Sequence, residues 1–269
     1  MRTHLFLIFS FVFYVISSEG FSQKGDTIFN QKDSQGRKQG FWKVQYPNGS
    51  IKYTACFKDD KPIGLLKRYF EDNSIKAEMI FDAKGKAKAR IYYQDGPLAG
   101  EGNYINSFKD STWNYYSYYT KALSNRETYV NNKKNGLSIS YYPNGKIAEE
   151  LNWKDNVRNG IWHQYYENGA LKTSSEFLNG KRNGTFILYY PDSKIEWKGS
   201  YKNDIREGQW VHYDPLGKIN STIEYKNGVA SNAAELDAKE QELLKEIEKK
   251  KGKIPEPDET NIMNPAKNE

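Results

Sequence analysis

Hydrophobic positions in this chain recur with a period of 24 residues. An aliphatic residue that follows a turn is succeeded six residues later by an aromatic one. The pairs are Ile51/Phe57, Ile75/Phe81, Leu123/Tyr129, Ile147/Trp153, Leu171/Phe177, Ile195/Tyr201 and Ile219/Tyr225. Glycines mark the same interval at Gly136, Gly160, Gly184 and Gly208. Self-similarity at a fixed period predicts a repeat architecture in which each unit packs on its neighbours.

Each unit has the pattern of a β-hairpin. From Leu171 to Leu178, alternate residues place an apolar or small side chain on one face and polar ones on the other, as in a strand. The preceding Asn168 and Gly169 supply the positive φ that a tight hairpin turn needs. We therefore predict an all-β fold, an elongated single-layer antiparallel meander of about eight stacked hairpins. The units open near Gly40, Gly64, Lys88, Ser111, Gly136, Gly160, Gly184 and Gly208.

The N-terminal segment has the pattern of a secretion signal. Arg2 precedes an apolar run from Leu5 to Ile16, which is too short to span a bilayer but fits a signal-peptide core. We predict a signal peptide over residues 1–22, cleaved after Ser22, and a polar lead-in over 23–36. The mature protein is then exported to the periplasm, the outer-envelope surface or the medium, with no transmembrane segment.

The pattern changes after the repeat array, which we place at residues 37–228. Residues 229–252 are rich in Ala, Leu, Glu and Lys and predict a C-terminal helix. A cap over the last strand is the favoured interpretation, and a coiled-coil partner helix is the alternative. Residues 253–269 hold three prolines without periodicity, which predicts a disordered tail.

The composition supports a folded chain. Its mean hydropathy of −0.88 is strongly polar. However, 15% of its residues are aromatic, whereas disordered chains are poor in aromatic residues. Cys56 is the only cysteine, which excludes an intramolecular disulfide and a cysteine-based metal site. Because no cysteine lies near the predicted cleavage site, we do not expect a lipoprotein. The net charge of +6 permits attraction to anionic surfaces without requiring it.

Three short segments carry a resemblance to a known family. Tyr-Tyr-Pro-Asn-Gly-Lys-Ile (141–147), Tyr-Tyr-Glu-Asn-Gly-Ala-Leu (165–171) and Asn-Gly-Lys-Arg-Asn-Gly (179–184) resemble MORN-type repeats. The similarity is greatest to the variant form in the YwqK family of bacterial antitoxins, and it covers residues 37–228. The resemblance implies a β-hairpin array with a binding or scaffolding role and no catalytic residues.

Basic residues form the first candidate binding feature. They precede the glycine position of most units, where stacking would align them along one edge of the sheet. Charged turns that protect the edge from pairing are the favoured interpretation, and docking of an anionic polymer or an acidic protein is the alternative. The residues are Arg37, Lys38, Lys61, Lys133, Lys134, Arg158, Lys181, Arg182 and Arg206.

Tryptophans form the second candidate. Trp42, Trp113, Trp162 and Trp210 each lie two residues after the start of a unit. Packing between neighbouring units is the favoured interpretation. An exposed aromatic strip that binds a protein or a glycan is the alternative.

No motif in the chain predicts chemistry. His163 and His212 occupy adjacent positions of their units, so their side chains should point to opposite faces of the sheet. We expect no catalytic residue, metal or cofactor, and export with a modest charge disfavours nucleic acid. The predicted function is non-enzymatic protein binding or scaffolding in the cell envelope. The alternatives are an antitoxin or immunity-type protein that binds a toxin, and a module that binds polysaccharides or surfaces.

Overall fold

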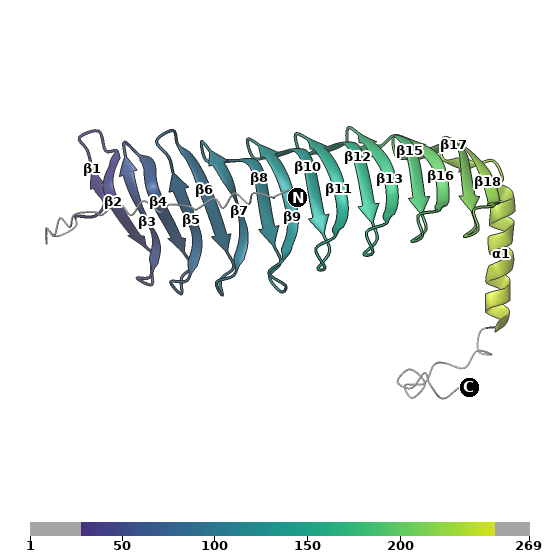
Figure 1. Ribbon diagram of the computed structural model, residues 1–269, viewed down its shortest axis with the longest axis horizontal. Coiled ribbons are helices and arrows are strands. Elements are labelled where there is room, and N and C mark those ends of the chain that lie inside the picture. Colours follow the sequence, from purple (N-terminus) through teal and green to yellow (C-terminus); the bar gives the residue numbers. More distant parts are fainter. Residues whose placement is uncertain (1–27, 251–269) are drawn as a thin grey trace, which may run out of the picture.

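The computed structural model describes residues 28–250, which form one elongated, twisted antiparallel sheet with a helix at its C-terminal end (Figure 1). The predicted all-β meander is therefore confirmed. The predicted signal peptide (1–22), most of the lead-in and the predicted tail (253–269) lie outside the described residues.

In the described residues the sheet has 19 strands, and consecutive strands pair antiparallel, except that β14 and β15 both pair with β13. The strands are β1 (Gln31–Lys32), β2 (Lys38–Gln45), β3 (Ile51–Lys58), β4 (Lys61–Tyr69), β5 (Ile75–Phe81), β6 (Lys86–Tyr92), β7 (Leu98–Ile105), β8 (Phe108–Tyr116), β9 (Leu123–Val130), β10 (Lys133–Tyr141), β11 (Ile147–Lys154), β12 (Val157–Tyr165), β13 (Leu171–Leu178), β14 (Lys181–Arg182), β15 (Gly184–Tyr189), β16 (Ile195–Lys202), β17 (Ile205–Tyr213), β18 (Ile219–Lys226) and β19 (Val229–Ala230). The predicted units correspond to the hairpins that begin with β2 and end with β18.

The two long edges of the sheet carry different turns. On one edge, which we call the short-turn edge, two residues with positive φ join most consecutive units, as at Asp155 (φ 49°) and Asn156 (φ 69°). This is the geometry of a type I′ turn, whose twist matches the flanking strands. The exception is the longer turn from Asp82 to Gly85, between β5 and β6, in which Gly85 alone has positive φ (78°). On the other, the long-turn edge, the turn at Tyr166–Ala170 closes with Gly169 N–H donating to the Tyr166 carbonyl oxygen at 2.8 Å. The Asn168 side chain accepts from Ala170 N–H at 2.9 Å, so Asn shapes this turn while Gly169 alone takes positive φ (93°).

The periodic glycines do not open the units, which corrects the prediction. β12 begins at Val157, and Gly160 lies inside it with a φ of 108°. The register between β11 and β12 shifts beside this glycine, so Gly160 marks a β-bulge. A bulge needs a residue that tolerates positive φ, which explains the repeated glycine. The basic residues before each glycine therefore belong to strands.

One face of the sheet, which we call the aromatic face, holds the packed side chains. It carries the periodic aromatics, among them Phe57, Tyr129 and Phe177, and the tryptophans two residues beyond each bulge. Trp113 is fully buried there beside Ala89 and Tyr129. A single layer obtains a core in this way because long side chains lie along the sheet and cover one another.

Tyrosine hydroxyls join one unit to the next at the long-turn edge. Tyr166 Oη donates to the Tyr189 carbonyl oxygen at 2.7 Å. The same bond recurs from Tyr46, Tyr93, Tyr142 and Tyr190, each to a carbonyl 23 residues further along. These bonds help to fix the stacking of hairpins that would be marginal alone.

The predicted C-terminal helix is present as α1 (Ala233–Lys250). Its side chains Leu243, Leu244 and Ile247 are about half exposed, so this part of α1 does not cover the last strand with its apolar residues. Within residues 28–250, none of the helical structure combines the length and apolar character that crossing a bilayer requires.

Candidate functional site

One cross-strand pair recurs on the aromatic face beside the short-turn edge. The last aromatic residue of a hairpin lies opposite a cation in the next strand, because the intervening two-residue turn fixes the register. The pairs are Tyr104–Lys109, Tyr129–Lys134, Trp153–Arg158, Phe177–Arg182 and Tyr201–Arg206. Lys38 holds the same position in the first hairpin. We call Lys38, Lys109, Lys134, Arg158, Arg182 and Arg206 the cation row.

Each member of the cation row lies over an aromatic ring. Arg182 Cζ is 4.0 Å from the centre of the Tyr201 ring. Lys109 Nζ and Arg206 Cζ lie 4.6 Å from the rings of Trp113 and Trp210, and the other three members are stacked similarly. A cation at this range is attracted by the ring quadrupole, by about 0.5–1 kcal/mol at exposed sites. The rings therefore hold the cations in defined positions.

The backbone of the row is held by the following turn. Lys134 N–H donates to Asn156 Oδ1 at 2.7 Å, and Asn156 N–H donates back to the Lys134 carbonyl oxygen at 2.9 Å. Lys38 with Asp60, Lys109 with Asn132 and Arg182 with Asp204 repeat this reciprocal pair. Since each unit adds two strands, the cations of adjacent units are spaced by roughly 10 Å.

Ion pairs neutralise part of the row. Lys134 Nζ lies 2.5 Å from Glu127, and Arg182 Nε lies 3.1 Å from Asp204. The other four members form no ion pair with any residue between 28 and 250. Glu127 also accepts a hydrogen bond from the Tyr129 hydroxyl. Burial, and then this bond, raise the pKa of Tyr129 and keep it neutral beside the row.

The basic residues predicted as one line separate onto two faces. Lys61, Lys133 and Lys181 each precede a residue on the aromatic face, so the strand period turns their side chains to the opposite face, where they are exposed. Arg37 instead pairs with Asp33 at 2.7 Å and with Asp59 at 3.0 Å. Only Lys38, Lys134, Arg158, Arg182 and Arg206 of the predicted set belong to the cation row.

The four predicted tryptophans lie in the packed layer of the aromatic face. Trp113 and Trp210 are 0% and 2% exposed, and Trp42 is also buried. Trp162 is partly buried and donates from Nε1 to Glu149 at 2.7 Å. Any partner would therefore meet these rings through the cations and tyrosines above them, and the face is not an open aromatic strip.

The two histidines point to opposite faces, as predicted. His212 stacks on Trp197 on the aromatic face, with ring centres 4.5 Å apart. His163 lies on the other face, with Nδ1 3.9 Å from Glu150. No group of three or more His, Cys, Asp or Glu side chains suited to a metal ion occurs in the described part of the chain.

Sequence reasoning missed Lys109. The fourth unit carries one extra residue, so Lys109 precedes Lys134 by 25 residues, whereas the later steps of the row, from Lys134 to Arg206, are 24. The pairing of Lys109 with Tyr104 restores the common register. The signal was the aromatic residue five positions earlier, a spacing that every complete pair of the row shares.

The sequence profile of the MORN repeat variant matches five segments of the chain, at residues 38–59, 134–155, 158–179, 182–203 and 206–227. Each of these five segments is similar to a MORN-type repeat. Each begins at a member of the cation row, so the recurring cation is part of the repeat. The hairpins between residues 60 and 133 have the same architecture but do not match the profile.

Other comparisons add little. No curated protein matches the chain. Among solved structures, the Photorhabdus luminescens Tc holotoxin pore is similar over 73% of this chain, with 11% sequence identity and a TM-score of 0.21. The match spans only 11% of that chain, and a likeness this weak carries no argument about function.

Proposed function

We propose that this protein is an exported, non-catalytic platform that binds an acidic protein partner along its aromatic face. The observation that carries the proposal is the cation row, which places one positive group in the first unit and in each unit from the fourth to the eighth, at a regular spacing. The predicted signal peptide supports export, and the MORN-type repeats support a binding role. An antitoxin or immunity-type role would be a special case in which the partner is a toxin.

The physical argument rests on multiplicity. A single exposed ion pair contributes only about 0–1 kcal/mol, which is too little for a specific complex. Several such contacts at regular spacing along one rigid sheet act together, since the first contact raises the effective concentration of the next. An extended acidic partner gains from every unit that it covers, whereas a small anion gains from one.

The test compares two variants with the same change in charge. The row variant carries Lys109→Gln, Arg158→Gln and Arg206→Gln, and the matched control carries Lys61→Gln, Lys133→Gln and Lys181→Gln on the opposite face. Tagged mature proteins capture partners from an envelope extract. We expect the row variant to lose an acidic protein that the wild type and the control retain. Equal recovery by both variants would contradict the proposal.

A further inference from the structure

The aromatic–cation pairing is interrupted in the second and third units. Phe57 lies opposite Pro62, and Phe81 lies opposite Ala87, where the complete pairs have Lys or Arg. Since neither Pro62 nor Ala87 has a long side chain, nothing at these positions extends over the neighbouring rings. Lys38 covers Phe57 from the preceding strand, at 4.8 Å from the ring centre. Phe81 receives no cation from the described residues.

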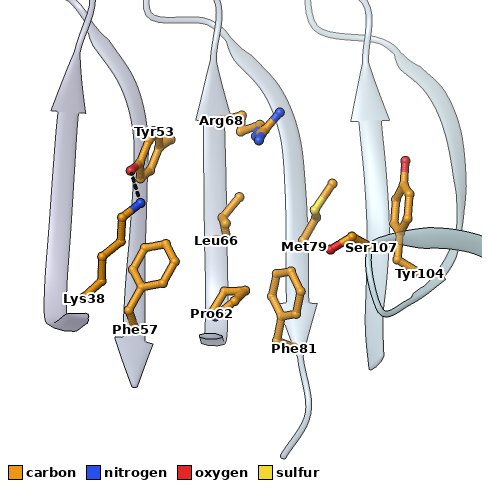
Figure 2. A pocket seen from close by; sticks show the side chains of 10 residues that line it. All are labelled: Lys38, Tyr53, Phe57, Pro62, Leu66, Arg68, Met79, Phe81, Tyr104 and Ser107. Atoms are coloured by element: carbon orange, nitrogen blue, oxygen red, sulfur yellow. Dashed lines mark hydrogen bonds between the residues drawn. The ribbon is translucent and has the colours of Figure 1, made fainter. Parts of the chain in front are cut away.

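A groove of about 460 Å³ lies on the aromatic face at Pro62, the first of the two positions without a cation (Figure 2). Its apolar lining comes from three consecutive hairpins and comprises Phe57, Pro62, Leu66, Met79, Phe81 and Tyr104. Its volume falls within the range of sites that bury a ligand group. Elsewhere on this face, the chain's own cation covers the corresponding rings.

The charged groups of the groove are all positive. Lys38 and Arg68 line it, and none of its lining residues is acidic. Lys38 Nζ donates to the Tyr53 hydroxyl at 3.3 Å, which holds the ammonium group at the edge of the groove (Figure 2). Arg68 is exposed and forms no ion pair with any residue in the described range. An apolar surface between two unpaired cations is complementary to an apolar group that carries a negative charge.

We infer that this groove is the anchor site for an extended partner segment in which an aromatic or large aliphatic side chain is flanked by carboxylates. The apolar side chain fills the space above Pro62, between Phe57 and Phe81, and the carboxylates lie against Lys38 and Arg68. The inference rests on the proposed function, because Lys38 belongs to both the groove and the cation row. An extended partner that follows the row therefore reaches the groove without a change of direction.

Met79 provides a direct probe of the groove. The chain has three methionines, and the other two, Met1 and Met263, lie outside the described residues. In protein labelled with ¹³C at the methionine methyls, the Met79 signal is assigned by its loss in Met79→Leu. The probe is the peptide acetyl-Glu-Phe-Glu-amide, titrated against the full mature chain. We expect a saturable shift of the Met79 signal, with a dissociation constant at least fivefold weaker for acetyl-Glu-Ala-Glu-amide and for acetyl-Gln-Phe-Gln-amide.

Two filling variants test the location. Pro62→Lys and Pro62→Arg each restore the residue type of the complete pairs, so both should fold, and each should abolish the Met79 response although it adds positive charge. Arg68→Gln should weaken peptide binding roughly two- to fivefold, the effect of one exposed ion pair. The matched control Arg90→Gln lies on the opposite face and should leave binding unchanged.

The outcomes separate this inference from the proposed function. An unresponsive Met79 signal, equal binding of acetyl-Lys-Phe-Lys-amide, or unaltered binding to both filling variants would overturn the groove as an acidic anchor site. If capture of the acidic protein depends on the cation row but not on Pro62→Lys, the groove inference fails and the platform stands. If the peptide binds as expected while the row variant retains every partner, the groove stands alone and the platform fails.

Discussion

At the scale of single residues, two glycines determine how the tryptophans are buried. A Cβ atom added at Gly102 would lie 2.3 Å from Trp113 Cδ2, and one added at Gly199 would lie 2.3 Å from Trp210 Cδ2. Neither glycine has a positive φ, so neither is explained by backbone conformation. Both are required because an indole ring lies directly on the backbone of the neighbouring strand.

Gly102→Ala should therefore destabilise the protein by about 1–3 kcal/mol, the usual cost of overpacking a core. The measurement is the midpoint of urea unfolding. In a Trp113→Leu background the same substitution should cost much less, because the ring that it displaces is absent. An equal loss in both backgrounds would show that the indole is not the cause.

A second prediction concerns the Asp72 carboxylate on the long-turn edge. It accepts hydrogen bonds from the Ser74 hydroxyl at 2.6 Å and from Gln94 Nε2, in the next turn, at 2.9 Å. These bonds, with that from Ser74 first, lower the pKa of Asp72 from 3.8 to about 2. Since its pKa is lowered by folding, its stabilising contribution is complete above pH 3.8 and is lost as the pH falls towards 2. Carbon-detected NMR titration should show this pKa, and Ser74→Ala should move it back towards 3.8. A titration curve unchanged by Ser74→Ala would contradict the assignment.

At the scale of the hairpin, the tyrosine bonds between units give the next prediction. Tyr166→Phe removes only the hydroxyl that donates to the Tyr189 carbonyl oxygen, so it should lower stability by about 0.5–1.5 kcal/mol. Phe70 occupies the equivalent turn position in the second unit and shows that the ring alone is compatible with the fold. The control is Tyr119→Phe, whose side chain is 88% exposed and should cost nothing measurable in urea unfolding. A similar cost for both changes would mean that the inter-unit bond contributes nothing.

At the scale of the hairpin, the sequence was sufficient to predict the repeating units but not the face on which each basic side chain lies. The 24-residue series and the alternation from Leu171 to Phe177 were enough to give the units, their direction and the aromatic face. The faces of Lys181 and Arg182 could not be assigned in the same way. The face of each side chain depends on where β14 begins relative to the turn and the bulge. Because the periodic glycine was interpreted as the start of the unit, the residues before it were assigned to a turn and not to a strand. The groove was missed for the same reason, since Pro62 and Ala87 become equivalent to Lys134 only once the strand register is known.

At the scale of the whole molecule, the sheet behaves as a one-dimensional array. Each hairpin pairs only with its two neighbours, so the loss of one complete unit should leave every remaining interface intact. Deletion of residues 158–181 joins Val157 to Arg182. The turn at Asp155 and Asn156 is retained, and Trp153 then lies opposite Arg182. The aromatic–cation pair is therefore preserved, with Arg182 in the place of Arg158. We expect the shortened protein to fold cooperatively.

Small-angle scattering measures the consequence directly. Two strands are removed at about 4.8 Å each, so the maximum dimension should fall by roughly 10 Å, with the β-sheet circular dichroism signal preserved. The matched control deletes residues 171–182, which comprise β13, the turn at Asn179 and Gly180, and the two residues of β14. The turn at Tyr166–Ala170 then leads directly into β15, which must run opposite to its native direction, so its bulge, its following turn and its aromatic residues no longer match the neighbouring strands. It should abolish the cooperative unfolding transition. If the 24-residue deletion unfolds the protein as thoroughly as the 12-residue one, stability depends on contacts between distant units and the array description is wrong.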